Sequence, residues 1–466
     1  MTEGSAAERT SRLSGLPVPG DYKDPRTPEQ RDAERRMVSV QVRSLGGSRT
    51  DGYYQRRLIE EVQRRRASQA DKGVLQFDVV QSKGIPTLIV SGELLVRREF
   101  LAADGFARDV LSRAGFAEKG DSAGDCPELS KVVARFTRSD IEAEELAGVG
   151  RWLRGRRIPA SVNHVTPLAA IIKGQGGAEP SSGRRPFATA TRPAEPDGRV
   201  PVAVIDTGIA AEKRGDQWLQ YADVPRPGDN FDETNVFPDG NDPFLDFGSG
   251  HGTFVTGIVQ QVHPTAKICV YRAVDSDGIG SEMRVGCAMI RAVEEGARIL
   301  NLSVGSQTID DGPPVALEAA LEIIGQRAPD ALVIAAAGNY GDTRPCWPAA
   351  FRRVVAVGAV KADLTPAADW SSHGVWVDCS TVGEGVVSTY LPGQESPFID
   401  PSPDLFGEDS WAVWTGTSFA APQIAGAIAR LCDSDGLTPR QALAALLAAG
   451  FTLPNFGRVV EILPGT

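Results

Sequence analysis

Three short segments of the sequence carry side chains whose chemistry is complementary. Asp206 directly follows an apolar run at 202–205, His251 lies among glycines, and Ser418 stands where a helical pattern begins. A serine hydroxyl is a weak nucleophile until an imidazole accepts its proton, and the imidazole needs a carboxylate that fixes its tautomer and stabilises its cation. The three residue types together therefore predict nucleophilic attack on a carbonyl carbon.

A fourth segment supplies a side-chain amide. Asn339 follows the apolar run 331–337, which has the character of a buried strand. The tetrahedral intermediate of acyl transfer needs hydrogen-bond donors aimed at its oxyanion. Ser418 at the start of a helix also lies beside unpaired backbone N–H groups. We therefore expect Asn339 to complete an oxyanion hole next to Ser418.

Each of these residues alone has a simpler explanation. An aspartate after a strand is commonly a turn residue, a histidine among glycines is commonly a loop residue, and a serine before a helix is commonly its N-cap. The prediction therefore depends on the combination of the four segments and on no single one.

The elements that must position these residues alternate between strands and helices from Val200 onward. This order predicts an α/β fold with a mostly parallel sheet and helices on both faces. In such a sheet, side chains at the carboxyl ends of strands project into a crevice, where we expect Asp206. Apolar strands are expected at 202–205, 267–271, 299–304, 331–337 and 354–360, and helices at about 281–296, at 314–326 and from about 418.

The part of the chain before Val200 has a different organisation. Residues 1–36 are rich in Pro, Gly, Arg and Glu and are expected to be a disordered lead-in. Shorter strand and helix patterns over 37–173 predict a smaller α+β N-terminal domain. The Gly-, Pro- and Ser-rich stretch 174–199 is expected to be a linker, which leaves 200–466 as the domain with the candidate catalytic residues.

The four segments resemble the signatures of the subtilisin family of serine peptidases. Asp-Thr-Gly stands at Asp206, His-Gly-Thr at His251, Gly-Thr-Ser-x-Ala-x-Pro at Ser418 and Ala-Gly-Asn at Asn339. The order Asp, His, Ser is also that of the family. The resemblance covers about 200–450 and implies a three-layer subtilisin-like fold. It further implies a serine endopeptidase that forms an acyl-enzyme intermediate.

The resemblance also implies where a peptide substrate would bind. An extended substrate would lie along 302–305, with its P1 side chain beside 335–338 and Ala349 on the floor of the pocket. Because Ala349 is small and uncharged, we expect large apolar P1 residues to be accepted. The substrate-binding residues expected on this basis are Leu302, Ser303, Val304, Gly305, Ala336, Gly338 and Ala349.

The sequence departs from the family pattern near the catalytic candidates. Phe254 replaces a common second histidine, Phe419 and Ala421 replace Met and Thr, and Gln423 replaces a frequent His. None of these positions transfers a proton, so we expect intact chemistry and an altered pocket edge. The other histidines, His164, His263 and His373, are expected to be structural.

Two functions remain open for 37–173: an inhibitory pro-domain that assists folding, or a module that recruits the protease to a partner. Residues 1–200 hold 33 Lys and Arg against 27 Asp and Glu, a net charge of +6, and the rest of the chain has a net charge of −17. A catalytically silent scaffold whose basic half binds a partner or nucleic acid is therefore a further alternative. Few aromatic residues lie among the arginines, so binding of nucleic acid is not favoured.

No required cofactor is expected. The acidic stretch 223–246 could bind calcium, but it lacks the spacing of a calcium loop, and a solvated loop is favoured. Six scattered cysteines and the absence of a signal peptide or membrane-spanning pattern indicate reduced thiols in a cytoplasmic protein. The expected partners are a protein or peptide substrate and the chain's own N-terminal domain, with no membrane.

Overall fold

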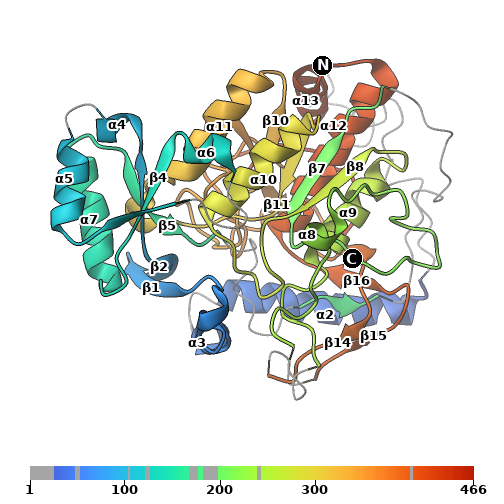
Figure 1. Cartoon of the computed structure of the whole chain (residues 1–466). Helices are drawn as coiled ribbons and strands as arrows, with labels where there is room; N and C mark the ends of the chain where they lie inside the picture. The colour runs from blue at the N-terminus through green and yellow to red at the C-terminus, as the bar shows by residue number, and fades with distance from the viewer. Residues whose placement is uncertain are drawn as a thin grey trace.

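A computed structural model of the whole chain shows how these segments are arranged (Figure 1). The residues that it describes are 26–47, 53–102, 105–120, 126–166, 177–181, 198–238, 243–398 and 402–465. Residues 1–25 of the expected lead-in and most of the expected linker, 174–176 and 182–197, lie outside the described residues.

A twisted eight-stranded sheet forms the centre of the larger part of the protein. Its strand order is β17-β18-β12-β11-β10-β9-β7-β8, and all neighbouring strands are parallel except the pair β17 and β18. The five strands expected from the sequence are all present. The strands are β7 (Val202–Asp206), β8 (Ile268–Arg272), β9 (Ile299–Leu302), β10 (Leu332–Ala336), β11 (Val354–Val360), β12 (Cys379–Val382), β17 (Phe451–Leu453) and β18 (Gly457–Val459).

Helices cover both faces of this sheet because its strands are apolar on both sides. In β7, Val202 and Val204 face one hydrophobic core, while Ala203 and Ile205 face another. The first core includes residues of α9 (His251–Val262), α12 (Ala421–Asp435) and α13 (Pro439–Ala449). The second includes residues of α10 (Glu282–Glu294) and α11 (Val315–Arg327).

A second, antiparallel sheet lies beside α10 and α11 (Figure 1). It has the order β1-β2-β4-β3, with β5 also paired to β2, and it surrounds a core of its own. Its first turn is a two-residue hairpin at Lys83-Gly84, where both residues have positive φ. The elements are β1 (Phe77–Ser82), β2 (Ile85–Arg97), α4 (Glu99–Ala102), α5 (Phe106–Arg113), β3 (Ala117–Lys119), α6 (Pro127–Ser130), β4 (Val133–Thr137), α7 (Ala143–Gly155) and β5 (Ala160–His164).

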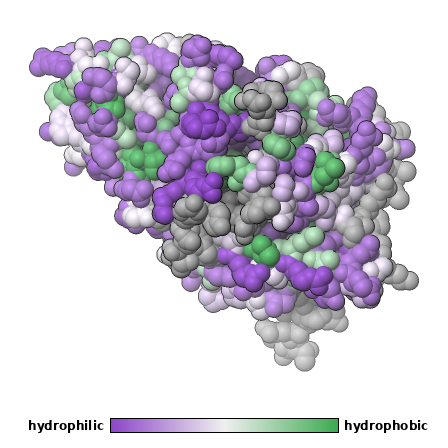
Figure 2. Space-filling view, turned by 90° about the horizontal axis from the view of Figure 1, so that it is seen from below, coloured by the Kyte–Doolittle hydropathy of each residue, from purple (hydrophilic) through white to green (hydrophobic). Residues whose placement is uncertain are grey.

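Two helices precede this sheet and contact the larger part of the protein. Helix α2 (Pro28–Gly47) begins within the segment expected to be disordered, so residues 28–36 are helical instead. Val38 of α2 packs with Trp411 and Val413, and α3 (Tyr53–Ala67) follows it in the chain. These contacts bury apolar side chains of α2 and so stabilise the helix. The composition of residues 28–36 alone did not indicate this burial. The face that is seen from below is mainly hydrophilic, with hydrophobic residues scattered over its coloured surface (Figure 2).

The remaining elements are short. They are η2 (Ala70–Lys72), β6 (Glu179–Pro180), α8 (Pro227–Asn230), η3 (Ile309–Asp311), β13 (Val386–Thr389), β14 (Gly393–Gln394), β15 (Leu405–Phe406), β16 (Trp411–Trp414) and η4 (Thr417–Phe419). All six cysteines are buried and unbridged, as predicted. None of the described helices combines the length and the apolar character needed to cross a membrane.

Candidate active site

Asp206 and His251 form a direct hydrogen-bonded pair. Asp206 is the last residue of β7, and His251 is the first residue of α9. His251 Nδ1 lies 2.7 Å from Asp206 Oδ1, and both side chains are fully buried. An ionised carboxylate only accepts hydrogen bonds, so this contact places the proton on Nδ1 and leaves Nε2 as the basic nitrogen. The pair has the geometry needed for a base that is oriented by a carboxylate.

A second carboxylate, which sequence reasoning did not identify, supports this pair. Asp232 Oδ2 accepts hydrogen bonds of 2.9 Å from Thr207 Oγ1 and from the backbone N–H of Gly250. Thr207 Oγ1 in turn accepts a 3.0 Å bond from Gly252 N–H. Burial raises the pKa of Asp232 to about 6, against the effect of these donors. The bonds tie the end of β7 to the start of α9, the two positions that hold Asp206 and His251.

The close approach of these two backbones explains one glycine. A Cβ atom at Gly252 would lie 2.0 Å from the carbonyl oxygen of Gly208. Real Cβ contacts are never that short, so any side chain would push α9 away from β7. The His-Gly dipeptide is therefore required by packing next to the catalytic candidates.

Ser418 lies in η4, just before α12. Its Oγ donates a 3.3 Å hydrogen bond to the carbonyl oxygen of Ser303, while Ser303 Oγ donates a 2.8 Å bond to the carbonyl oxygen of Ser418. His251 Nε2 has no hydrogen-bond partner among the described residues. The His251 ring lies 5.4 Å from that of Phe419, the residue after Ser418. The three predicted catalytic side chains thus lie in one region, with the serine hydroxyl turned toward Ser303.

The side-chain carbonyl group of Asn339 is held in place by hydrogen bonds. Its Oδ1 accepts hydrogen bonds from Thr417 N–H at 2.9 Å and from Thr417 Oγ1 at 3.0 Å. Thr417 Oγ1 accepts from Gly338 N–H at 3.1 Å, so three hydrogen bonds join the two segments. The amide nitrogen faces the backbone of the serine turn, because a Cβ atom at Gly416 would lie 3.2 Å from Nδ2. Thr417 was not identified from the sequence, although it lies next to Ser418.

The expected substrate-binding segments border this centre. Leu302 ends β9, Ala336 ends β10, and a Cβ atom at Gly305 would lie 3.8 Å from the carbonyl oxygen of Ala336. Ser303, Val304 and Gly338 lie in the same two segments. Ala349, in contrast, is only 1% exposed and packs in the core on the α10 and α11 face.

The departures from the family pattern form an aromatic cluster behind the histidine. The rings of Phe254 and Phe419 lie 4.6 Å apart, and both lie near Trp414, whose ring is 5.4 Å from His251. Phe254 and Phe419 are fully buried. Our expectation that these positions would reshape the pocket edge is therefore wrong for the two phenylalanines, which pack in the core.

The acidic stretch before His251 also differs from its expectation as a solvated loop. Asp232 and Asp246 are buried and hydrogen-bonded, whereas Asp239 and Asp242 lie outside the described residues. No group of three or more His, Cys, Asp or Glu side chains in the described ranges could hold a metal ion.

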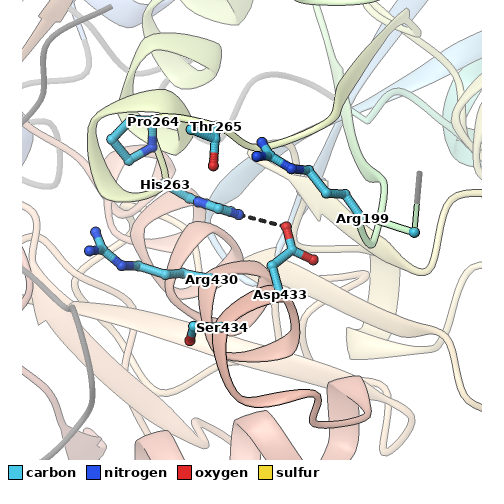
Figure 3. A pocket seen from close by; sticks show the side chains of 8 residues that line it. Arg199, His263, Pro264, Thr265, Arg430, Asp433 and Ser434 are labelled. Atoms are coloured by element: carbon cyan, nitrogen blue, oxygen red, sulfur yellow. Dashed lines mark hydrogen bonds and ion pairs between the residues drawn. The ribbon is translucent and has the colours of Figure 1, made fainter. Parts of the chain in front are cut away.

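A cavity of about 490 Å³ lies at the other end of α9 from His251 (Figure 3). His263 Nε2 pairs there with Asp433 Oδ2 at 2.8 Å, and Arg199 and Arg430 lie on either side. The pair joins the ends of α9 and α12, so this histidine has a packing contact of its own, away from the catalytic candidates.

Comparisons with known proteins bear on the same region. The family model of the subtilases matches residues 197–452. A thermophilic serine proteinase of Bacillus sp. (strain AK1) is 30% identical over 245 residues, which cover 50% of this chain and 52% of the relative. Thermitase of Thermoactinomyces vulgaris is 29% identical over 216 residues, or 44% of this chain and 69% of thermitase.

A solved structure extends the likeness in fold beyond the family match. Fervidolysin from Fervidobacterium pennivorans, described as a keratinolytic enzyme related to subtilisin, has a TM-score of 0.52 and 17% identity. The match covers 80% of this chain and 60% of fervidolysin. This chain thus spans about half the length of the Bacillus relative and somewhat more of the other two. With the family model matched over more than half of its residues, the chain belongs to the subtilase family.

Proposed function

We propose that the protein is a serine endopeptidase with Ser418 as nucleophile, His251 as general base and Asp206 as the carboxylate that orients it. The observation that carries this proposal is the buried 2.7 Å contact between His251 Nδ1 and Asp206, which leaves Nε2 as the basic nitrogen. The likeness of the chain to serine peptidases supports it and does not favour a silent scaffold.

The reaction follows from these positions. Rotation about χ1 moves Ser418 Oγ from the Ser303 carbonyl toward His251 Nε2, which takes its proton as Oγ attacks the substrate carbonyl. The negative charge forms on the carbonyl oxygen, and Asn339 Nδ2 donates to it. His251 then gives its proton to the leaving amine, and an acyl-enzyme remains. Water, activated by the same histidine, releases the acid.

The hydrogen bonds that hold Asn339 reduce the reorganisation that the site needs during the reaction. Thr417 holds the Asn339 amide before any substrate binds, so the oxyanion donor needs no reorientation during attack. Substrate would add an extended strand along Leu302–Gly305, with a large apolar P1 side chain beside Ala336 and Gly338. Ala349 would line the P1 pocket from behind these segments.

We further propose that the sheet of the N-terminal α+β domain, β1 to β5, is an inhibitory pro-domain, and that α3 stays bound to the larger part. The last strand of this sheet, β5, docks on the larger part through Glu282, which accepts from the backbone N–H groups of His164 at 3.0 Å and Ala316 at 2.9 Å. Thr166 N–H donates a 2.8 Å bond to Gly280 O. Gly280 lies in the segment that starts at Ala273, whose N–H binds Asp206 O at 2.8 Å.

The end of the N-terminal domain therefore pairs with a segment attached to the catalytic aspartate. Asp206, His251 and Ser418 are all 0% exposed. A recruitment module would have no need to contact this segment. The appearance of two fragments in active enzyme, absent in Ser418→Ala, would separate the two functions.

The test of the catalytic proposal is labelling by a fluorophosphonate probe. Wild-type protein should be labelled once, and Ser418→Ala should not be labelled. Ser434→Ala is the matched control, because Ser434 is an exposed serine at the end of the helix that follows the nucleophile. Equal labelling of wild type and Ser418→Ala would refute the assignment. Absence of labelling in wild type, both before and after the linker is cut, would refute the activity itself.

A further inference from the structure

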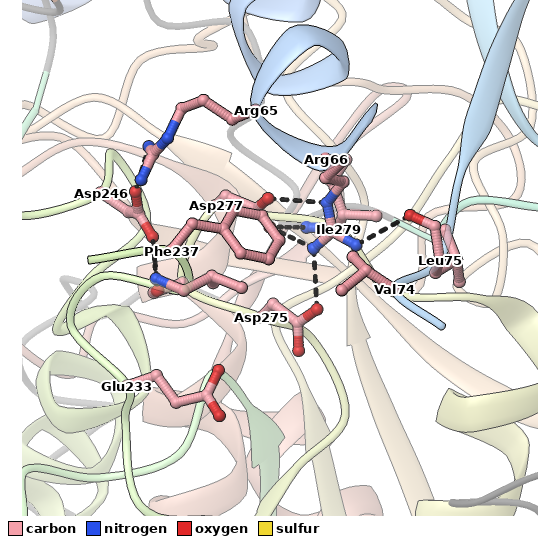
Figure 4. A network of polar contacts seen from close by, with 12 residues as sticks. Arg65, Arg66, Val74, Leu75, Glu233, Phe237, Asp246, Asp275, Asp277 and Ile279 are labelled. Atoms are coloured by element: carbon pink, nitrogen blue, oxygen red, sulfur yellow. Dashed lines mark hydrogen bonds and ion pairs between the residues drawn. The ribbon is translucent and has the colours of Figure 1, made fainter. Parts of the chain in front are cut away.

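Helix α3 inserts an arginine into the larger part of the protein (Figure 4). The Arg66 side chain is 1% exposed. Its Nε and Nη2 bind the two oxygens of Asp277, each at 2.7 Å, and Nη2 also binds Asp275 Oδ2 at 2.7 Å. Its Nη1 donates to the carbonyl oxygen of Leu75 at 3.1 Å. A planar guanidinium can make this fork of contacts, whereas the point charge of a lysine cannot.

The preceding arginine makes a second contact of the same kind. Arg65 Nη1 lies 2.6 Å from Asp246 Oδ1, and Nη2 lies 2.8 Å from Asn235 Oδ1. Both guanidinium groups lie within 6 Å of the Phe237 ring centroid, at 5.9 Å for Arg65 and 5.7 Å for Arg66. The end of α3 is thus bound by carboxylates and an aromatic face.

The three carboxylates depend on these arginines for charge balance. Asp246, Asp277 and Asp275 are 1%, 3% and 15% exposed. Apart from α3, the one cation that the described residues bring to them is Arg284, which binds Asp275 Oδ1 at 2.6 Å. Removal of one partner of a buried pair leaves an uncompensated charge, which is strongly unfavourable. The site is therefore incomplete without α3.

The two loops that carry these carboxylates lead to the catalytic pair. Asp246 lies five residues before His251, and its Oδ2 accepts a 2.8 Å bond from Ser276 Oγ. The loop with Asp275 and Asp277 starts at Ala273, whose N–H binds the carbonyl oxygen of Asp206. A shift of these loops would therefore be transmitted to both Asp206 and His251.

We infer that Arg66 is a positioning residue for the proposed peptidase, and that Asp246, Asp275 and Asp277 form a guanidinium-binding site that α3 occupies. The guanidinium fixes the two loops and, through them, the distance between Asp206 and His251. This inference rests on the proposed function for its kinetic readout only. An enzyme that lost α3 would need another guanidinium group or a change of charge at this site.

The protonation of the site agrees with this assignment. Burial opposes the charge of Arg66, but Asp277 and Asp275 outweigh it and raise its pKa. Burial also opposes the charge of Asp275, yet Arg284 and Arg66 lower its pKa to about 2. Burial raises the pKa of Asp277 to about 6 in spite of Arg66. Of the two carboxylates that bind Arg66, Asp277 is therefore the one that more readily takes a proton when the arginine is removed.

The kinetic test compares Arg66→Ala with Arg64→Ala. Arg64 is the matched control, because it lies two residues away on α3 with its side chain 68% exposed. We expect kcat/KM to fall about 10²-fold for Arg66→Ala, mainly through kcat, and less than about twofold for Arg64→Ala. The ratio of Arg66→Ala to wild-type activity should rise as the pH falls, because Arg66 no longer lowers the pKa of the buried Asp277, and a proton then neutralises its orphaned charge.

Chemical rescue tests the guanidinium chemistry. Millimolar guanidinium chloride should restore Arg66→Ala at least about tenfold, while equal sodium chloride should not. If Arg66→Ala fails to fold, the double variant Arg66→Ala/Asp277→Asn, in which Asp275 keeps Arg284 as its partner, should fold and keep activity. Equal kcat/KM for Arg66→Ala and Arg64→Ala, or rescue by sodium chloride alone, would overturn the inference.

A second readout does not need activity. In the Ser418→Ala background, hydrogen exchange of segments 243–250 and 273–281 should be at least about tenfold faster for Arg66→Ala than for Arg64→Ala. Unchanged exchange would overturn the inference even if the enzyme is active. Faster exchange in a protein that never reacts with fluorophosphonate would support the guanidinium site and refute the proposed peptidase.

Discussion

Thr417 should control the oxyanion donor without touching substrate, and substitution by valine isolates this role. Thr417→Val has nearly the same shape but loses the hydroxyl that donates to Asn339 Oδ1 and accepts from Gly338 N–H. The backbone N–H of Thr417 still holds Asn339 Oδ1 at 2.9 Å. The amide should therefore be loosened rather than released.

The size of the effect follows from the number of bonds lost. A neutral hydrogen bond contributes about 0.5–1.5 kcal/mol, and about 1.4 kcal/mol in an activation free energy is a factor of ten in rate. Loss of one of the two bonds that orient Asn339 should therefore lower kcat about 2- to 12-fold. Asn339→Ala removes the donor itself and should lower kcat about 10²–10³-fold, a range known from a subtilisin rather than worked out from these distances. KM should change little in both variants.

The double variant decides whether Thr417 acts through Asn339. Without the amide, Thr417→Val should lower kcat less than about twofold further. Thr415→Val is the matched control, because Thr415 Oγ1 also donates one bond, to Gln41, and accepts one, from Gly385 N–H. Rates are measured as kcat per site titrated with fluorophosphonate. Full additivity of Asn339→Ala and Thr417→Val, or a loss for Thr415→Val as large as for Thr417→Val, would refute the reasoning.

Three further outcomes are expected. Ser418→Ala, His251→Ala and Asp206→Asn should each abolish hydrolysis in folded protein, and a Ser418/His251 double variant that lost far more rate than either single variant would contradict a triad. Burial raises the pKa of Asp232 from 3.8 to about 6, so the folded protein keeps a proton that the unfolded chain has released between these values. The free energy of unfolding should therefore fall from about pH 4 to pH 6 by at most about 3 kcal/mol, and urea unfolding of Ser418→Ala should lose this slope when Asp232→Asn is added. A peptide-library profile should favour large apolar P1 residues, and a preference for Arg or Lys would remove Ala349 from the proposed pocket.

The catalytic candidates could be predicted because their neighbours in the sequence carry the information. Asp206, His251 and Asn339 each follow or begin an element with clear periodicity, and apolar runs of four to seven residues indicated the buried parallel strands. The glycine beside His251 is also a local signal, because its cause is a close backbone contact. Local patterns therefore predicted most of the sheet and the elements that carry the catalytic candidates.

The buried charges could not be predicted in this way. Asp246 and its partner Arg65 are 181 residues apart, and Arg66 and Asp277 are 211 residues apart. Within its own segment each of these side chains has the pattern of a solvated residue, since burial is decided by a partner from another element. The same holds for α2, whose buried Gln41 binds the carbonyl oxygen of Val413 at 3.0 Å.

The buried Arg66 also changes the expected effect of salt on the association between the N-terminal part and the larger part of the protein. From the opposite charges we predict that the enzyme cuts itself between about 174 and 199, and that the N-terminal part stays bound as an inhibitor. Partly exposed pairs such as Arg154 with Asp310, 3.2 Å apart, are weakened at 1 M salt, where the Debye length is about 3 Å. The Arg66 pairs are buried and are screened much less. A protein cut at an engineered site within 182–197 should therefore elute as one complex in both low salt and 1 M salt. Arg66→Ala should elute as one complex in low salt only, and separation of the wild-type parts in 1 M salt would show that surface charge alone holds them together.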